Sequence, residues 1–154
     1  MPNDRTLSTT RVLPYPPEAV YSAFASGPVL ASWWGPKGFT NTFDVFDFAV
    51  GGRWVFTMHG PDGTNYANTS RFEALEPGQR VVIRHDCQPY FTLTVALSKV
   101  EGGTHLAWDQ VFDSAETAQA VKALVGTANE DNLDRLTQAL ARAHLPPGAQ
   151  NANG

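Results

Sequence analysis

A series of short strand-like segments followed by one long helical segment defines the organisation of this chain. Asp113-Ser114 is predicted to cap that helix, and Glu116 places a carboxylate in its first turn. The helix is predicted to run to about Arg142, a rod on the order of 40 Å. Gly126 lies in the middle of this helix, where glycine costs about 1 kcal/mol relative to alanine. It is either required for close packing or a plain surface glycine. One face is predicted to turn inward: Val121, Leu124, Val125, Ala128, Asn132, Leu136, Ala139 and Leu140.

The segments before the helix are β-rich, with alternating apolar and polar side chains. Clusters of Gly, Pro, Asp and Glu separate them, as is typical of turns. Two short helices are predicted near 18–25 and 29–34, with Gly27-Pro28 as the break between them. Short connections between successive strands favour an antiparallel meander. The predicted strands are 7–13, 39–48, 53–59, 66–75, 81–86, 90–100 and 104–112.

A sheet of this length can bury its apolar face by curling around the single long helix, which is an α+β architecture. With 154 residues the chain suits one domain, predicted at 1–144, with a disordered tail at 145–154. The net charge of −4 and the scattered basic residues argue against nucleic acid and anionic membranes as partners. No apolar run could cross a bilayer, and the first residues lack the apolar core of a signal peptide. We therefore expect a soluble, cytoplasmic protein that is a monomer or a homodimer.

Several short motifs also occur in a characteristic order. They are Trp33-Trp34-Gly35-Pro36, Asp47 before Gly51-Gly52-Arg53-Trp54, His59-Gly60-Pro61-Asp62-Gly63-Thr64 before Tyr66, Gly103-Thr104, Phe112-Asp113-Ser114-Ala115-Glu116, and Asn129 before Asn132-Leu133-Asp134-Arg135-Leu136. Over residues 6–142 this set resembles the family of the Hsp90 ATPase activator C-terminal domain (AHSA1-like). Ala49 and Val50 stand where that family usually has Arg-Pro.

That family lies in the START-like (SRPBCC) helix-grip superfamily of hydrophobic-ligand binders. The resemblance implies a curled antiparallel sheet of about six or seven strands around a long C-terminal helix, with two short helices after the first strand. It also implies an internal cavity for a hydrophobic ligand, such as a lipid- or polyketide-like molecule.

Large apolar side chains share the inner faces of the predicted strands, and they either fill a core or line a cavity. One helix face cannot fill all the space inside a curled sheet, so we predict a cavity between sheet and helix. Its predicted ligand-binding residues are Trp33, Trp34, Trp54, Phe56, Met58, Tyr66, Phe72, Ile83, His85, Phe91, Trp108, Gln110, Leu124, Ala128 and Asn132.

The two adjacent tryptophans either plug the core or form an aromatic wall at the cavity mouth, and we expect one inside and one on the rim. The mouth is predicted where the 33–36 loop, the start of the long helix and the strand ends near Tyr66 and His59 meet. As a rim residue, Trp34 is expected to contribute about 1–3 kcal/mol to ligand binding and little to fold stability.

Three polar residues are predicted to face inward. His85 alternates in step with Ile83, and Gln110 with Trp108, while Asn132 lies on the inner face of the helix. His85 is either a satisfied core histidine or a proton carrier, because its ordinary pKa lies near neutrality. Gln110 and Asn132 either orient a ligand by hydrogen bonds or are satisfied core amides.

Patterns typical of catalytic and cofactor sites are absent from the sequence. It has no Gly-x-Gly-x-x-Gly or Walker motif, no Gly-x-Ser-x-Gly elbow, no His pair four residues apart, and Cys87 as its single cysteine. No cofactor, metal or internal disulfide is therefore expected.

The leading hypothesis is a binding protein for a small hydrophobic or aromatic molecule. The resemblance also allows a cyclase- or hydrolase-type enzyme, for which His85 is the sole catalytic candidate. A third hypothesis is an Hsp90-type co-chaperone, although such family members carry an additional N-terminal domain and this chain starts directly at its first strand.

Overall fold

The computed structural model describes residues 4–144, within which the strands form a seven-stranded antiparallel sheet in the order β1-β7-β6-β5-β4-β3-β2. The strands are β1 (Thr6–Leu13), β2 (Thr40–Phe46), β3 (Arg53–His59), β4 (Asn65–Glu76), β5 (Arg80–His85), β6 (Phe91–Val100) and β7 (Gly103–Phe112). The helices are α1 (Pro17–Ala25), α2 (Gly27–Trp33) and α3 (Ala115–Ala143). The α+β helix-grip fold is therefore confirmed, whereas the predicted tail at 145–154 lies outside the described residues.

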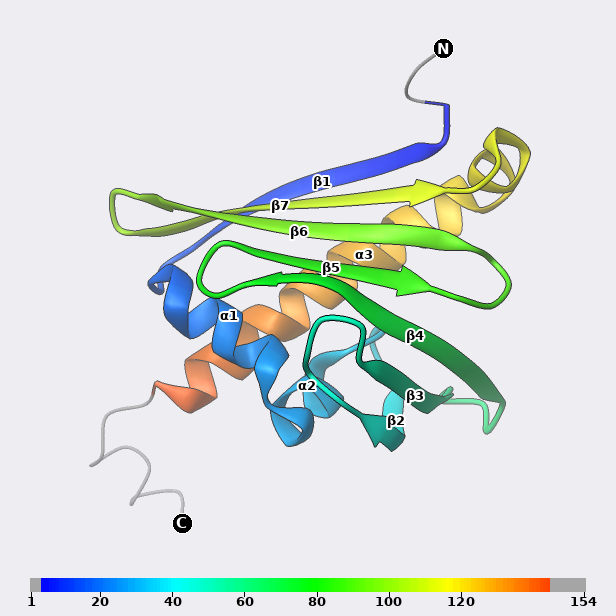
Figure 1. Ribbon diagram of the computed structural model, residues 1–154, viewed down its shortest axis with the longest axis horizontal. Helices are drawn as coiled ribbons and strands as arrows, with labels where there is room; N and C mark the ends of the chain where they lie inside the picture. Colours follow the sequence, from blue (N-terminus) through cyan, green and yellow to red (C-terminus); the bar gives the residue numbers. More distant parts are fainter. Residues whose placement is uncertain (1–3, 145–154) are drawn as a thin grey trace.

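Strand order follows the chain except at β1, which pairs with β7. Figure 1 shows α3 running behind the sheet and across its strands, with α1 and α2 beside its C-terminal half. The inner face of the sheet is thus covered by α3 along its length and by α1 and α2 at one end only. No helix in the described part of the chain is both long and apolar enough to span a membrane.

Helix α3 begins and ends within one residue of the prediction. The Oγ of Ser114 caps it by accepting a hydrogen bond from the backbone N–H of Thr117 at 3.0 Å. Two details differ from the sequence-based prediction. Leu124 is 76% exposed rather than turned inward, and a side chain added at Gly126 would meet nothing within 4 Å. Gly126 is therefore a surface glycine that close packing does not require.

The break between the short helices falls at Ser26 rather than at Gly27-Pro28. Ser26 caps α2 through its Oγ, which accepts from the N–H of Val29 at 3.4 Å. Pro28 then lies in the first turn of α2, where a missing N–H costs nothing. The prediction was wrong because proline starts a helix as readily as it ends one.

Strand β2 ends at Phe46, two residues before the predicted end, because the chain turns back at Asp47. Gly51 has a φ of 81°, a left-handed conformation that favours glycine. At Gly52 an added Cβ would lie 2.1 Å from the carbonyl oxygen of Asp47. The double glycine is thus a structural requirement of the β2–β3 turn.

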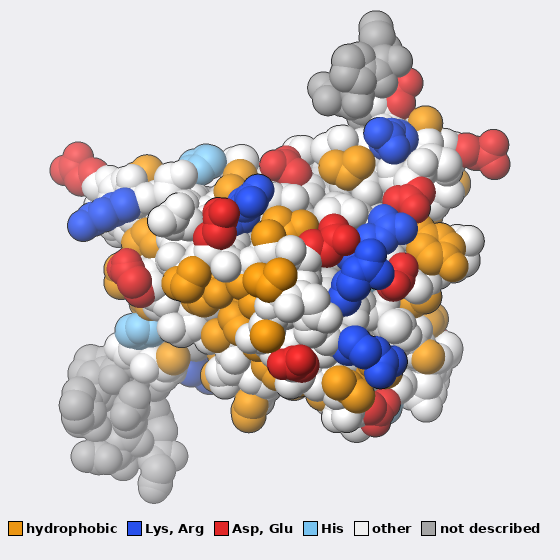
Figure 2. Space-filling view, in the orientation of Figure 1, with side chains coloured by type: hydrophobic (Ala, Val, Ile, Leu, Met, Phe, Trp, Pro, Cys, Tyr) orange, Lys and Arg blue, Asp and Glu red, His pale blue; other side chains and the backbone are white. Residues whose placement is uncertain are grey.

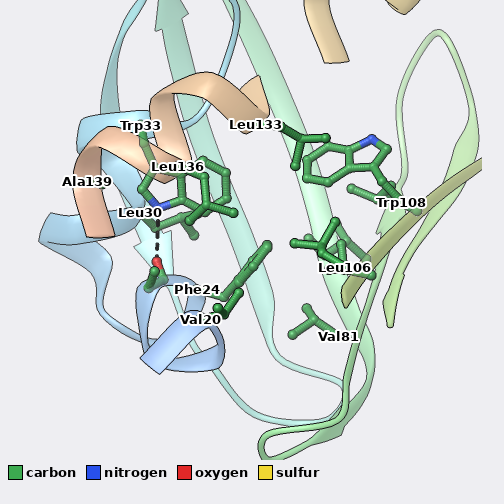
Figure 3. Close-up of a cluster of buried hydrophobic side chains, with 14 of the residues drawn as sticks. Val20, Phe24, Leu30, Trp33, Val81, Leu106, Trp108, Leu133, Leu136 and Ala139 are labelled. Atoms are coloured by element: carbon green, nitrogen blue, oxygen red, sulfur yellow. Dashed lines mark hydrogen bonds between the residues drawn. The ribbon is translucent and has the colours of Figure 1, made fainter. Parts of the chain in front are cut away.

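The filled part of the core lies where α1 and α2 meet the C-terminal half of α3 (Figure 3). Trp33 is fully buried there, and its Nε1–H donates to the carbonyl oxygen of Ala23 at 3.1 Å. Its ring meets Phe24 edge-on, with 5.0 Å between the ring centroids. Trp54 and Phe72 are also fully buried and stack in parallel at 5.8 Å. These four aromatic side chains pack in the core and do not border a cavity.

Charges of both signs alternate on the outer face of the sheet (Figure 2). Arg71 pairs with Asp86 and Arg84 pairs with Asp113, with N–O distances of 2.7 Å in both pairs. Such partly exposed pairs contribute about 0–1 kcal/mol each to stability. The outer face of the sheet is therefore mixed in charge.

Candidate ligand-binding cavity

A cavity of about 230 Å³ separates the inner face of the sheet from the middle of α3. Strands β3 to β7 form its floor, α3 forms its roof, and the chain just after α2 closes one side. Most of the residues predicted to bind a ligand lie on its wall: Trp34, Phe56, Met58, Ile83, His85, Phe91, Trp108, Gln110, Ala128 and Asn132. Their contact with a ligand stays a prediction.

The remaining predicted residues lie elsewhere. Trp33, Trp54 and Phe72 belong to the filled core, because α1 and α2 pack against that end of the sheet. Of the adjacent tryptophans, Trp33 is therefore inside and Trp34 borders the cavity. Tyr66 and Leu124 are 47% and 76% exposed and border an outer hollow.

Several wall residues are missing from the predicted ligand-binding set, although the 33–36 loop was predicted to lie at the mouth and Val125 on the inner face of the helix. They are Gly35, Pro36, Asn68, Ser70, Pro89, Leu93, Val125 and Asn129. Alternation along β4 could have identified two of them, since Asn68 and Ser70 share a strand face with Phe72. Asn129 lies one helical turn before Asn132, so helical spacing could have identified it as well. No local pattern marks Pro89.

The outer hollow, of about 770 Å³, adjoins the cavity and shares several of its wall residues, among them Pro36, Met58 and His85. Helix α3 contributes its third to fifth turns here, from Leu124 to Asp131, rather than its start. His59 is not at this opening, because its ring is hydrogen-bonded between Thr42 and Asn65. The opening therefore lies between the Pro36 loop, the Tyr66 end of β4 and the middle of α3.

His85 faces the cavity at the end of β5 and is only 8% exposed. Its ring stacks on Phe91 with centroids 4.5 Å apart. Nδ1 lies 2.7 Å from the carbonyl oxygen of Pro89, and Nε2 lies 2.7 Å from Oδ1 of Asn68. Burial is the main influence on the pKa of His85 and lowers it from the ordinary value, while the bond to Pro89 acts in the opposite direction.

Buried amide side chains on β7 and α3 form a further polar part of the cavity wall. Asn132 is 6% exposed, and its Oδ1 accepts a hydrogen bond from the backbone N–H of Gly35 at 3.0 Å. Because a backbone N–H can only donate, this bond fixes the Nδ2 group of Asn132 as a free donor. Gln110 is equally buried and accepts a hydrogen bond from Nδ2 of Asn129 at 3.0 Å. Within residues 4–144, Gln110 and Asn132 thus each use the side-chain oxygen in a hydrogen bond and leave the NH2 group without a partner. This arrangement lies between a fully satisfied core amide and a group that orients a ligand, the two predicted alternatives.

Arg135 holds the loop that closes the cavity. Its guanidinium donates to five backbone carbonyl oxygens at 2.9–3.1 Å, those of Ser32, Trp34, Gly35, Pro36 and Phe39. Partial burial lowers its pKa from the ordinary value. Arg135 lies in the last of the recurring motifs, but no local pattern predicted a role for it. It acts on the cavity by fixing the position of Trp34 and Pro36.

The charge inside the cavity is limited to one titratable group. His85 is the one ionisable side chain on the wall of the inner cavity, and no carboxylate, lysine or arginine joins it among the described residues. The thiol of Cys87 lies near the ring, with Sγ 3.5 Å from Nε2. In residues 4–144 no three His, Cys, Asp or Glu side chains are grouped so that they could hold a metal ion.

A curled antiparallel sheet that holds a long C-terminal helix over an internal cavity defines a START-like, helix-grip protein. The model of the family "Activator of Hsp90 ATPase homolog 1-like protein" matches residues 14–141, and the chain belongs to this family.

Solved structures show the same fold. A protein from Rhodobacter sphaeroides is 28% identical with a TM-score of 0.80, over 90% of this chain and 93% of that one. A protein from Chromobacterium violaceum is 27% identical with a TM-score of 0.76, over 86% and 95%. An AHSA1-like protein from Aeromonas hydrophila is 23% identical with a TM-score of 0.70, over 92% and 96%. A search of the curated proteins gave no significant match.

Proposed function

We propose that this protein binds a small hydrophobic or aromatic molecule in the cavity between the sheet and α3. The observation that carries the proposal is the division of the interior. One end is filled by Trp33, Trp54 and their neighbours, whereas the other end holds a cavity with aromatic walls and a few buried polar groups. That combination is typical of small-molecule sites, in which apolar walls supply affinity and a few polar groups fix orientation.

The cavity size limits the ligand. An apolar cavity of roughly 150 Å³ holds benzene, so about 230 Å³ suits a ligand of about two fused rings or a short acyl chain. A longer ligand would extend past Met58 and His85 into the outer hollow. Burial of each 100 Å² of apolar ligand surface would contribute about 2.5 kcal/mol.

The binding test uses an anilinonaphthalene sulfonate probe and native mass spectrometry after mild purification. Ala128→Phe places a ring in the cavity and should weaken probe binding at least tenfold, because Ala128 borders both the cavity and the outer hollow. Ala123→Phe is the matched control, since Ala123 is exposed on another face of α3. Equal probe binding by wild type and Ala128→Phe would show that the cavity is not the site, and a wild-type protein that binds no probe would refute the proposal.

The enzyme hypothesis depends on His85 as a general acid or base. Both ring nitrogens lie 2.7 Å from protein acceptors, the carbonyl oxygen of Pro89 and Oδ1 of Asn68, so both are directed at the protein rather than at a substrate. This arrangement favours binding over proton transfer as the role of His85.

A further inference from the structure

His85 lies between two hydrogen-bond acceptors. The carbonyl oxygen of Pro89 can only accept, so Nδ1 must carry a proton to bond with it. On the other side, Nδ2 of Asn68 donates to the carbonyl oxygen of Tyr66 at 3.0 Å, which turns its Oδ1 toward Nε2. A neutral ring could satisfy only one of these two acceptors. The doubly protonated imidazolium satisfies both.

The charge of that imidazolium has no partner in the cavity. The wall contains no carboxylate. Of the charged groups near the ring, Arg84 opposes the imidazolium and Asp86 favours it, and both side chains are engaged on the outer face of the sheet, Asp86 with Arg71 and Arg84 with Asp113. Strands β4 and β6 and helix α3 present only uncharged side chains to the cavity, and the Cys87 thiol is the other titratable group in contact. Asp131 of α3 borders the outer hollow, where its carboxylate accepts a hydrogen bond from the N–H of Lys37. A buried charge without a partner is costly.

Strand β7 and helix α3 offer donors that also lack partners. Nδ2 of Asn132 on α3 and Nε2 of Gln110 on β7 make no hydrogen bond within the described residues. Nε1 of Trp108, also on β7, is fully buried and has no partner there. Oxygen atoms of a ligand in the cavity would accept hydrogen bonds from these donors.

We propose that the ligand is an organic acid bound as its carboxylate, whose oxygens accept hydrogen bonds from Asn132 and Gln110 and whose charge balances a protonated His85. This inference rests on the proposed binding function and names the chemical class of its ligand. The rings of Phe56, Phe91 and Trp34 would hold the apolar body of the acid. Binding then takes up one proton from solvent at the imidazole, because a nearby anion favours the charged ring.

The test compares 2-naphthoate with the uncharged 2-naphthamide, which has the same ring system. Calorimetric titrations at about pH 6 and about pH 8, where the naphthoate is ionised at both values, should show naphthoate binding at least tenfold tighter than the amide at the lower pH. The ratio should fall at the higher pH, since there binding must also protonate His85. In His85→Phe, which retains a ring against Phe91, the preference for the acid should disappear. His105→Gln, on the outer face of β7, is the matched control and should keep it.

A second readout follows the ring directly. NMR titration of the His85 imidazole should show its pKa rising when naphthoate binds and staying unchanged with naphthamide. Equal affinity for acid and amide, or a preference that survives in His85→Phe, would overturn the acid assignment and leave the binding function intact. Failure of both compounds to bind would instead count against the cavity as a binding site for two-ring aromatics, and with it against both proposals.

Discussion

Replacing Arg135 by methionine should loosen the loop that closes the cavity while keeping the aliphatic stem of the side chain. The guanidinium bonds five carbonyl oxygens between Ser32 and Phe39, so this one side chain determines how that loop lies on α3. Asn132 adds one further bond, to the N–H of Gly35. The loop makes few other connections to the helix, and Arg135 is therefore its main attachment.

The expected loss can be worked out from these bonds. A hydrogen bond in a folded protein contributes about 0.5–1.5 kcal/mol net, and more when the donor is charged. Nη1 and Nη2 carry four N–H groups between them, so one hydrogen is shared by two carbonyls, and the equivalent of four such bonds would sum to roughly 2–6 kcal/mol. The carbonyls nearest the surface can regain water. We therefore expect Arg135→Met to lower the free energy of unfolding by about 3 kcal/mol, which corresponds to about 6–12 °C in Tm for a chain of this size.

Urea denaturation followed by circular dichroism measures this loss, and hydrogen exchange at the Gly35 amide reports the loop itself. Arg142→Met is the matched control, because Arg142 is exposed in the last turn of the same helix. Exchange at Gly35 should be faster in Arg135→Met and unchanged in Arg142→Met. If the two variants unfold alike and Gly35 stays equally protected, Arg135 does not hold the loop and the reasoning is wrong.

Further variants test the core, the histidine and the helix. Trp54→Ala should cost about 3–5 kcal/mol of stability in thermal melts. Half-buried Trp34 packs against three other tryptophan rings, so Trp34→Ala should cost about 2 kcal/mol as well as weakening probe binding; equal losses in the two variants would make Trp34 a core plug. The lowered pKa of His85 means that the unfolded chain takes up the proton first, so stability should fall as pH drops below about 6.5, and His85→Phe should flatten that part of the pH profile. Gly126→Ala should raise Tm by about 2–4 °C, because the site is open and helical; a lower Tm would show that the glycine is required.

Local sequence patterns predicted most elements of this fold. Strand β3 begins and ends where alternation placed it, and α3 lies within one residue of its predicted bounds. The inward orientation of His85 and Gln110 followed from the same alternation. These features depend on neighbours one to four residues away, so periodicity is enough to predict them.

The Arg135 and His85 contacts could not be predicted in this way. Arg135 meets carbonyls about a hundred positions earlier in the chain, and the partner of His85 at Asn68 lies on the neighbouring strand. Such contacts depend on strand register and on how α3 crosses the sheet. Neither can be predicted from a short stretch of sequence.

The sequence by itself determined most of the side chains that face the interior, because alternation and helical spacing decide the side of each element on which a residue lies, although Leu124 is exposed against that pattern. Only the tertiary structure decided which of them fill that interior and which border a cavity. Trp54 and Phe56 show the difference, since they share one face of β3, yet Trp54 packs in the core and Phe56 borders the cavity. The physical reason is where the helices lie: α1 and α2 cover one end of the curled sheet, and α3 alone covers the other and leaves the space that a ligand would need.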